Sequence, residues 1–314
     1  MSEATKNNGV ELTPDKFEII GIDAEASERI LRPSLSYFQD VWRRLKQNKV
    51  AIFSACLLLV VIALVIFGPI FGQDYTAIDT NVANKNLWPN AQHWFGTDNL
   101  GRDLFARVCQ GGRISMMIAV ICTTLMTILG CTYGGVSGYY GGLVDDIMMR
   151  IIEIISSIPY LVLVILISLV LGRSIFSLVF AISITSWMST ARIVRGKILQ
   201  LREQEFVLAA QSLGASPARI IIKHLLPNTL GLVMVDITFS VPGFIFSEAF
   251  LSFIGLGVPS PNTSWGALAA TAQEKIQFYP YQLFFPCLLI SLVMLCFNLF
   301  GDGLNDALDP KLRQ

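Results

Sequence analysis

Long runs of apolar residues alternate with polar segments along this chain. Most of the runs approach the roughly 20 residues that an α-helix needs to cross the hydrocarbon core of a bilayer. We therefore predict an all-α integral membrane protein with six transmembrane helices. The runs cover residues 50–71, 114–132, 147–171, 175–189, 230–254 and 281–300.

Composition supports this prediction. Hydrophobic residues make up 53% of the 314 residues and charged residues only 15%, which is more apolar surface than a soluble domain can hide. The formal net charge is zero, which argues against a nucleic-acid partner. The six cysteines form no CxxC pair and five lie in apolar runs, so we interpret them as core residues without a disulfide or metal role.

The polar segments set the predicted topology. Residues 1–49 are expected to form a tail and a basic surface helix, residues 72–112 an extracytoplasmic segment, and residues 302–314 a C-terminal tail. Six crossings place both termini on one side, and lysine and arginine are concentrated there, as the positive-inside rule requires of the cytoplasmic face. Only a few positive charges lie on the predicted outer side: Lys85, Arg102, Arg107, Arg113, Arg173 and Lys275.

One polar stretch, residues 202–228, lies between the fourth and fifth apolar runs. Its first half predicts a short helix, because small and apolar side chains recur there at spacings of three, four and seven. The helix is too short and too charged to cross a bilayer, so it is expected to project into water. The stripe that would face a groove consists of Phe206, Ala209, Ala210 and Leu213.

The second half of this stretch predicts a tight turn and another helix. Gly214 stands where a left-handed helix-ending residue is needed. Ser216 follows as an N-cap, with Pro217 in the first helical turn, and the second helix is expected to stop at Pro227. Such a rigid pair of helices between membrane spans indicates a docking element.

Catalytic motifs are absent from the sequence. A P-loop of the form GxxxxGK[ST] does not occur, because Gly196-Lys197 lacks both the upstream glycine and the following hydroxyl residue. The chain has only two histidines, His93 and His224, and neither an HExxH nor a GxSxG motif. The sequence therefore argues against an enzyme and against a metal centre.

Four ionisable residues lie within the apolar runs, where charge is costly and rarely without a role. Arg150 and Glu153 are three residues apart, which predicts a structural ion pair, with a gating role as the alternative. Asp236 and Glu248 lie in the fifth run and are candidates for a water-filled translocation pathway. Their spacing puts them about 120° apart on a straight helix, so we expect only one of them to face it.

The outer segment contains GTDNLGRD at residues 96–103. Its glycines and charges predict a capped turn with short-range ion pairs that leads into the next helix. The alternative is a gate, or a contact with an outside partner.

The sequence resembles the inner-membrane permease subunits of ABC importers, and specifically the C-type subunits of oligopeptide and dipeptide permeases. In that superfamily a cytoplasmic loop carries a spaced sequence pattern. The pattern reads Glu-Ala-Ala, then three residues, Gly, nine residues, Ile, one residue and Leu-Pro. In this chain Leu208 and His224 replace the glutamate and the isoleucine of the pattern. Other segments are also similar to family signatures: GTDNLGRDLFARV, GGRIS, SGYYGG, ARIVRG, FLSFIGLG and GDGLNDALDPK. The positions that fit the pattern are Ala209, Ala210, Gly214, Leu226 and Pro227.

The resemblance implies a type I (MetI-like) permease core over residues 113–301, preceded by one extra span. It also implies that the cytoplasmic loop 191–229 couples the chain to a separate ATPase by apolar packing, since Leu208 replaces the acidic residue. The implied coupling residues are Glu205, Phe206, Ala209, Ala210, Leu213, Gly214, Ala215 and Ser216.

The implied assembly contains a B-type permease, two ABC ATPases that bind ATP and Mg²⁺, and an extracytoplasmic peptide-binding protein in the inner membrane of a prokaryote. This chain itself is expected to bind no cofactor. Oligopeptides are the expected substrates, with dipeptides, glutathione or nickel as alternatives. An ion-gradient-driven secondary transporter, which would favour inverted repeats, is the competing class, and a channel or receptor scaffold is a third.

Overall fold

Helices make up almost all of the regular structure. The computed structural model describes residues 37–71 and 80–308. Residues 1–36 of the predicted N-terminal region, residues 309–314 of the predicted C-terminal tail and residues 72–79 of the outer segment lie outside the described residues. The elements are α2 (Tyr37–Gln47), α3 (Lys49–Phe71), η2 (Val82–Asn84), α4 (Leu104–Tyr140), α5 (Gly142–Ser156), α6 (Tyr160–Leu171), α7 (Ile175–Leu201), α8 (Glu205–Ser212), α9 (Pro217–Ile220), η3 (Ile221–Leu225), α10 (Leu226–Phe253), α11 (Trp265–Gln273) and α12 (Pro280–Leu308).

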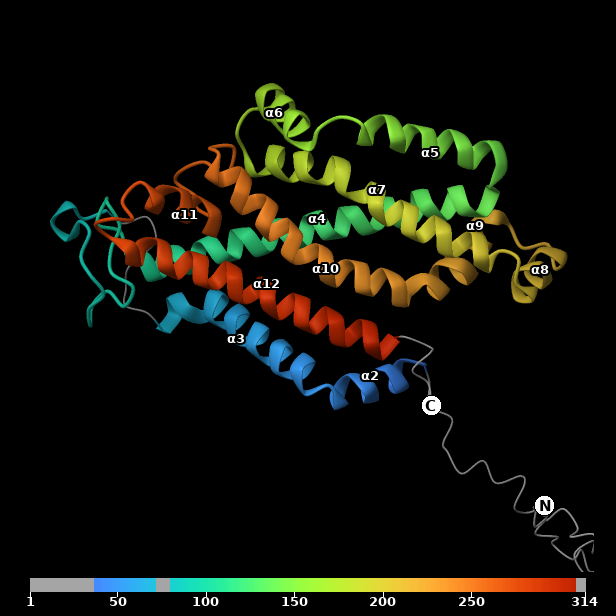
Figure 1. Ribbon diagram of the computed structural model, residues 1–314, viewed down its shortest axis with the longest axis horizontal. Coiled ribbons are helices and arrows are strands. Elements are labelled where there is room, and N and C mark those ends of the chain that lie inside the picture. Colours follow the sequence, from blue (N-terminus) through green and yellow to red (C-terminus); the bar gives the residue numbers. More distant parts are fainter. Residues whose placement is uncertain (1–36, 72–79, 309–314) are drawn as a thin grey trace, which may run out of the picture. The chain divides into compact units, whose positions relative to one another are not determined.

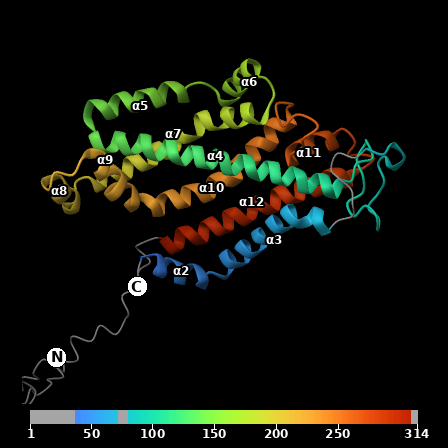
Figure 2. The same ribbon diagram turned by 180° about the vertical axis from the view of Figure 1, so that it is seen from behind.

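The long helices from α3 to α12 lie side by side with alternating directions (Figures 1 and 2). Within residues 37–71 and 80–308, five helical stretches are long and apolar enough to cross a membrane: α3, α4, α7, α9 to α10, and α12. The pair α5 and α6 counts as a sixth crossing if it is taken as one bent span. In both views α8 lies at one end of these helices, here called the α8 end, and α11 lies at the other, the α11 end.

The third predicted span, residues 147–171, is broken into α5 and α6, whose axes differ in direction by 80°. The break falls at Pro159, which caps α6 with an extended backbone. A proline removes a helical N–H and disfavours the helical conformation of the residue before it, so an apolar run alone does not guarantee a straight helix. Even so, the pair returns the chain from the α8 end to the α11 end (Figure 1).

Several helices extend beyond the apolar runs that predicted them. α4 begins at Leu104 and continues to Tyr140, so the end of the expected outer segment is helical. α12 runs through Asp302 to Leu308, so the first part of the expected C-terminal tail is also helical. α11 lies outside the predicted elements, although Ser264 is an N-cap signal whose hydroxyl accepts a hydrogen bond from the Ala267 N–H.

The glycines of α4 are needed for its close packing against α7. A Cβ atom on Gly134 would lie 2.4 Å from the carbonyl oxygen of Ala191, and one on Gly138 would lie 2.9 Å from that of Arg195. Gly130, one turn earlier, would meet the side chain of Thr190 in the same way. Small residues at every fourth position let two membrane helices approach closely, so the stripe joins α4 and α7 into one unit.

Candidate functional site

The α8 segment is attached to the helices by one buried side chain. Val207 has no exposed surface, and it belongs to an apolar cluster with Val194 and Ile198 of α7 and with Ile220 and Leu225 before α10. Sequence reasoning missed Val207, because a stripe drawn through Phe206 and Leu213 faces away from it. The cluster fixes α8 to the end of α7 and to the start of the next long helix.

The turn after α8 has the geometry that its sequence predicts. Gly214 has a φ of +77°, the left-handed conformation that glycine adopts without strain. The Ala215 N–H donates to the Ala210 carbonyl at 3.0 Å, which closes the helix end in the manner of a Schellman motif. Ser216 is the N-cap residue of α9, although its side chain makes no capping hydrogen bond.

The second helix does not stop at Pro227, contrary to the prediction. α9 leads through the π-helical turn η3 into α10, and Pro227 lies in the first turn of α10. A proline there is tolerated because the first N–H groups of a helix have no intrahelical acceptor. The Leu226 N–H instead reaches the Ile221 carbonyl, five residues back. The α8 segment is therefore continuous with a membrane-crossing helix.

The outer face of α8 is apolar and exposed. Phe206 is 41% exposed, Leu208 51% and Leu213 88%. Glu205, Ala209 and Ser216 are also exposed, whereas Ala210 and Ala215 pack partly against the Val207 cluster. The predicted set thus divides into an exposed apolar face and two alanines that help to attach it.

A charged contact joins α7 to α5 and α4 near the α8 end. Arg195 on α7 donates through Nε and Nη2 to the two carboxylate oxygens of Asp145 on α5, each at 2.5 Å. Asp145 also accepts from the Ser137 hydroxyl on α4. No local pattern predicts this contact, because Asp145 lies fifty residues before Arg195 in the sequence. Bidentate arginine–carboxylate pairs fix geometry as well as charge, so this contact orients α7 relative to α5.

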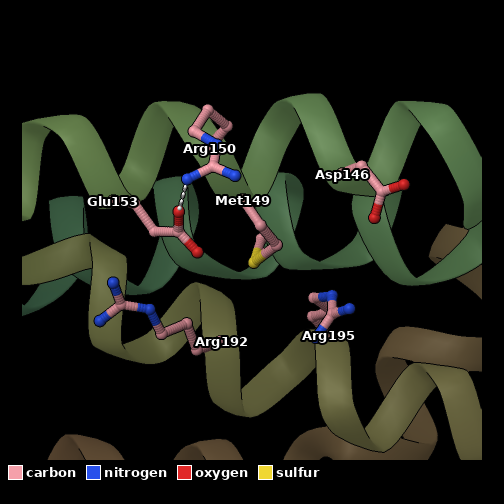
Figure 3. A pocket seen from close by; sticks show the side chains of 6 residues that line it. All are labelled: Asp146, Met149, Arg150, Glu153, Arg192 and Arg195. Carbon is pink, nitrogen blue, oxygen red and sulfur yellow. Dashed lines mark hydrogen bonds and ion pairs between the residues drawn. The ribbon is translucent and has the colours of Figure 1, made fainter.

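Arg150 and Glu153 form the ion pair that their spacing predicts. Arg150 Nη1 lies 2.7 Å from Glu153 Oε2, with the two side chains 75% and 57% exposed. Both line a cavity of about 670 Å³ between α5 and α7, together with Asp146, Arg192 and Arg195 (Figure 3). An exposed pair of this kind contributes little to stability.

The two carboxylates of α10 have different surroundings. Asp236 is half-buried and accepts a hydrogen bond from the Thr190 hydroxyl on α7 at 2.6 Å. Glu248 has no exposed surface in this structure; its carboxylate accepts from the hydroxyls of Ser115 at 2.8 Å and Ser252 at 2.7 Å. Glu248 therefore links α4 to α10 inside the protein, whereas Asp236 retains some exposed surface.

The outer segment ends in the capped turn expected from GTDNLGRD. Asp98 accepts from Arg102 Nε at 2.6 Å and lies 3.4 Å from Arg107 Nε. Asp103 caps α4 through the Ala106 N–H at 2.8 Å and contacts His93 Nδ1 at the same distance. Of the five polar side chains that make these contacts, all but that of Arg102 are buried.

The described residues contain no group of three or more His, Cys, Asp or Glu side chains placed to hold a metal ion. The geometry instead joins an exposed apolar helix to a membrane-crossing helix set.

Comparison with known proteins identifies the family. The model of the family described as "Binding-protein-dependent transport system inner membrane component" matches residues 130–314, more than half of the chain. The chain belongs to this family. A second model, "N-terminal TM domain of oligopeptide transport permease C", matches residues 36–89. Members of the binding-protein-dependent family are non-catalytic membrane components, so this permease is not itself an enzyme.

Curated relatives of this permease are similar over nearly their whole length. The chain is 45% identical to the dipeptide transport system permease protein DppC of Bacillus subtilis over 96% of this chain and 94% of that one. It is also 45% identical to the oligopeptide transport system permease protein OppC of the same organism, over 95% and 97%. The Escherichia coli K12 OppC protein is 42% identical over 91% and 95%.

A solved structure confirms the fold. An inward-facing MetNI methionine ABC transporter matches with a TM-score of 0.51 and 18% identity, covering 63% of this chain and 94% of that chain. The predicted all-α permease fold of the type I importers is therefore confirmed. These matches leave no support for the secondary-transporter alternative.

Proposed function

We propose that this chain is the C-type permease of an ATP-driven peptide importer. The equal similarity to dipeptide and oligopeptide permeases supports peptides as the substrate class. Oligopeptides are favoured because the N-terminal family model is that of the oligopeptide permease. Uptake assays with peptides of increasing length, with glutathione and nickel as competitors, test this choice. Preferential uptake of a single dipeptide, of glutathione or of nickel would contradict it.

The proposed assembly pairs this chain with a B-type permease, two ABC ATPases and an extracytoplasmic peptide-binding protein. ATP and Mg²⁺ bind to the ATPases, and both termini of this chain lie in the cytoplasm. The concentration of positive charge near the α8 end supports this orientation. Labelling of a cysteine introduced at Leu213 from only one side of sealed vesicles tests it.

The observation that carries the proposed coupling role is the exposed apolar face of α8 on a segment continuous with α10. In an aqueous compartment such a face favours a protein partner, since its burial stabilises a contact. Movement of an ATPase bound to Phe206, Ala209 and Leu213 would reach α7 through Val207 and α10 through η3. Glu205 and Ser216 lie at the edges of this proposed contact.

Gly214→Val tests coupling. The φ of +77° excludes a β-branched residue without strain, although no atom lies within 4 Å of the position of the added Cβ. We expect normal membrane insertion but a loss of transport and of ATPase co-purification. Gly196→Val is the matched control, because Gly196 on α7 also has open space but no positive φ. Full transport by Gly214→Val would remove the proposal.

We also propose that the translocation pathway passes beside Asp236 rather than Glu248. Asp236 retains exposed surface and lies where α7 and α10 meet, whereas Glu248 is enclosed. Asp236→Asn is expected to lower the transport rate without loss of protein from the membrane. Unchanged transport would place the pathway elsewhere.

A further inference from the structure

An apolar groove of about 400 Å³ lies between α3 and α4, with α10 and α12 behind it. Ile66 of α3 and Met117, Val120 and Ile121 of α4 line it and are exposed on the outer surface of the helices. All of its lining residues are apolar except one, Arg113. The groove is therefore an open apolar surface in the membrane region with a single positive charge.

Arg113 is held in place by the backbone of α3. Its Nε donates to the Val65 carbonyl at 3.0 Å and its Nη2 to the Ile66 carbonyl at 2.6 Å. Val65 has a free carbonyl because the residue four positions later is Pro69, which has no N–H. A guanidinium has five N–H groups, so three remain beyond these two hydrogen bonds.

The depth of the groove follows from the sequence. Arg113 directly precedes the apolar run 114–132, so it lies at the level where hydrocarbon gives way to polar headgroups. From Arg113 to Ile121 the groove extends eight residues along α4, or about 12 Å at 1.5 Å per residue. Its apolar part therefore reaches into the hydrocarbon core.

We propose that the groove binds one acyl chain of an anionic phospholipid, whose phosphate contacts Arg113. Guanidinium groups recognise phosphate oxygens through several parallel hydrogen bonds. A phosphate at the headgroup level can accept from the remaining guanidinium N–H groups, which an apolar helix of a partner subunit would leave without acceptors. The charge of Arg113 therefore favours a lipid over such a helix. The bound lipid attaches α3 to the permease core.

The test measures the lipid that stays bound to the transporter complex. The complex is purified with its partner subunits in nanodiscs of phosphatidylglycerol or phosphatidylcholine. It is then released from the nanodiscs, and native mass spectrometry counts the bound lipids. We expect retained phosphatidylglycerol in excess of phosphatidylcholine. Arg113→Gln should weaken phosphatidylglycerol binding about fivefold, because one basic residue at a membrane surface supplies that much. Arg113→Lys keeps the charge and should retain most of the binding.

Matched variants separate the groove from general effects. Val120→Phe fills the groove without touching Arg113 and should remove both lipids, whereas Ile128→Phe, exposed elsewhere on α4, should remove neither. Arg173→Gln removes another outer positive charge and should behave as the native chain does. Val120→Phe also keeps the proposal testable if Arg113→Gln fails to fold after the Val65 carbonyl loses its donor.

Three results would overturn the proposal. One is equal phosphatidylglycerol retention by the native chain and Val120→Phe. Another is displacement of the lipid by inorganic phosphate alone, which would mean that Arg113 binds the anion without the groove. The third is cross-linking of a photoreactive group at Val120 to a partner subunit instead of to lipid.

Discussion

The turn before α4, at the α11 end, and the α8 segment, at the α8 end, satisfy their residues in different ways. In the turn, Asp98 and Asp103 are buried and paired with residues of the same segment, including Arg102 and His93. In the α8 segment, apolar side chains such as Leu213 face outward, with only Val207 buried. The carboxylates of the turn are paired within this chain, whereas the apolar face of α8 is the surface of the proposed ATPase contact. The difference teaches that buried charges can be satisfied inside the chain, whereas an exposed apolar face leaves a contact to be made.

The largest expected effect is in the turn before α4. Asp98→Ala removes the carboxylate that Arg102 and Arg107 contact, and breaking a buried ion pair from one side costs about 3–5 kcal/mol. We expect a marked fall in the unfolding temperature of the purified protein, measured by fluorescence. An unchanged temperature would show that the segment before α4 does not depend on this carboxylate.

A smaller effect is expected where α8 is attached. Val207→Ala removes two buried methyl groups and leaves a cavity, which costs about 1.5–3 kcal/mol. Because the cluster joins α8 to α7, limited proteolysis should cut residues 202–228 faster than in the native chain. Leu208→Ala, on the exposed face, is the control and should not change the cleavage rate. Equal rates for both variants would mean that Val207 does not hold α8.

The exposed face itself should matter for partners but not for folding. Replacing Phe206 and Leu213 together by serine alters exposed side chains, so stability should change by less than about 0.5 kcal/mol. Co-purification of the ATPase should fall about tenfold or more, as expected when two central apolar contacts are lost. If ATPase binding persists undiminished, the comparison between the two ends loses its functional meaning.

The smallest effect is expected for Arg150→Ala. This pair is as short as those at the α11 end, but its side chains are largely exposed. Exposed pairs contribute about 0–1 kcal/mol, so the unfolding temperature should hardly move. A fall as large as that of Asp98→Ala would show that burial does not distinguish the two regions.

The sequence alone determined the features that depend on local chemistry. The lengths of the apolar runs gave the membrane-crossing helices, because a bilayer imposes the same requirement on every span. Gly214 and Pro217 predicted the turn after α8, because backbone conformation there follows from the residue type. These predictions needed no knowledge of neighbours in space.

Only the tertiary structure decided which residues meet. Ser115 lies 133 residues before Glu248, yet its hydroxyl is what makes that carboxylate part of the interior. The glycines around Gly134 locally favour a loop, but they lie in the helix α4. Their lack of a side chain lets α7 pack directly against that helix. Val207 likewise became the attachment of α8 only through α7 and the residues before α10. Hydrophobicity and backbone preference are properties of a segment, whereas burial and pairing are properties of the contacts between segments, so the sequence left them open.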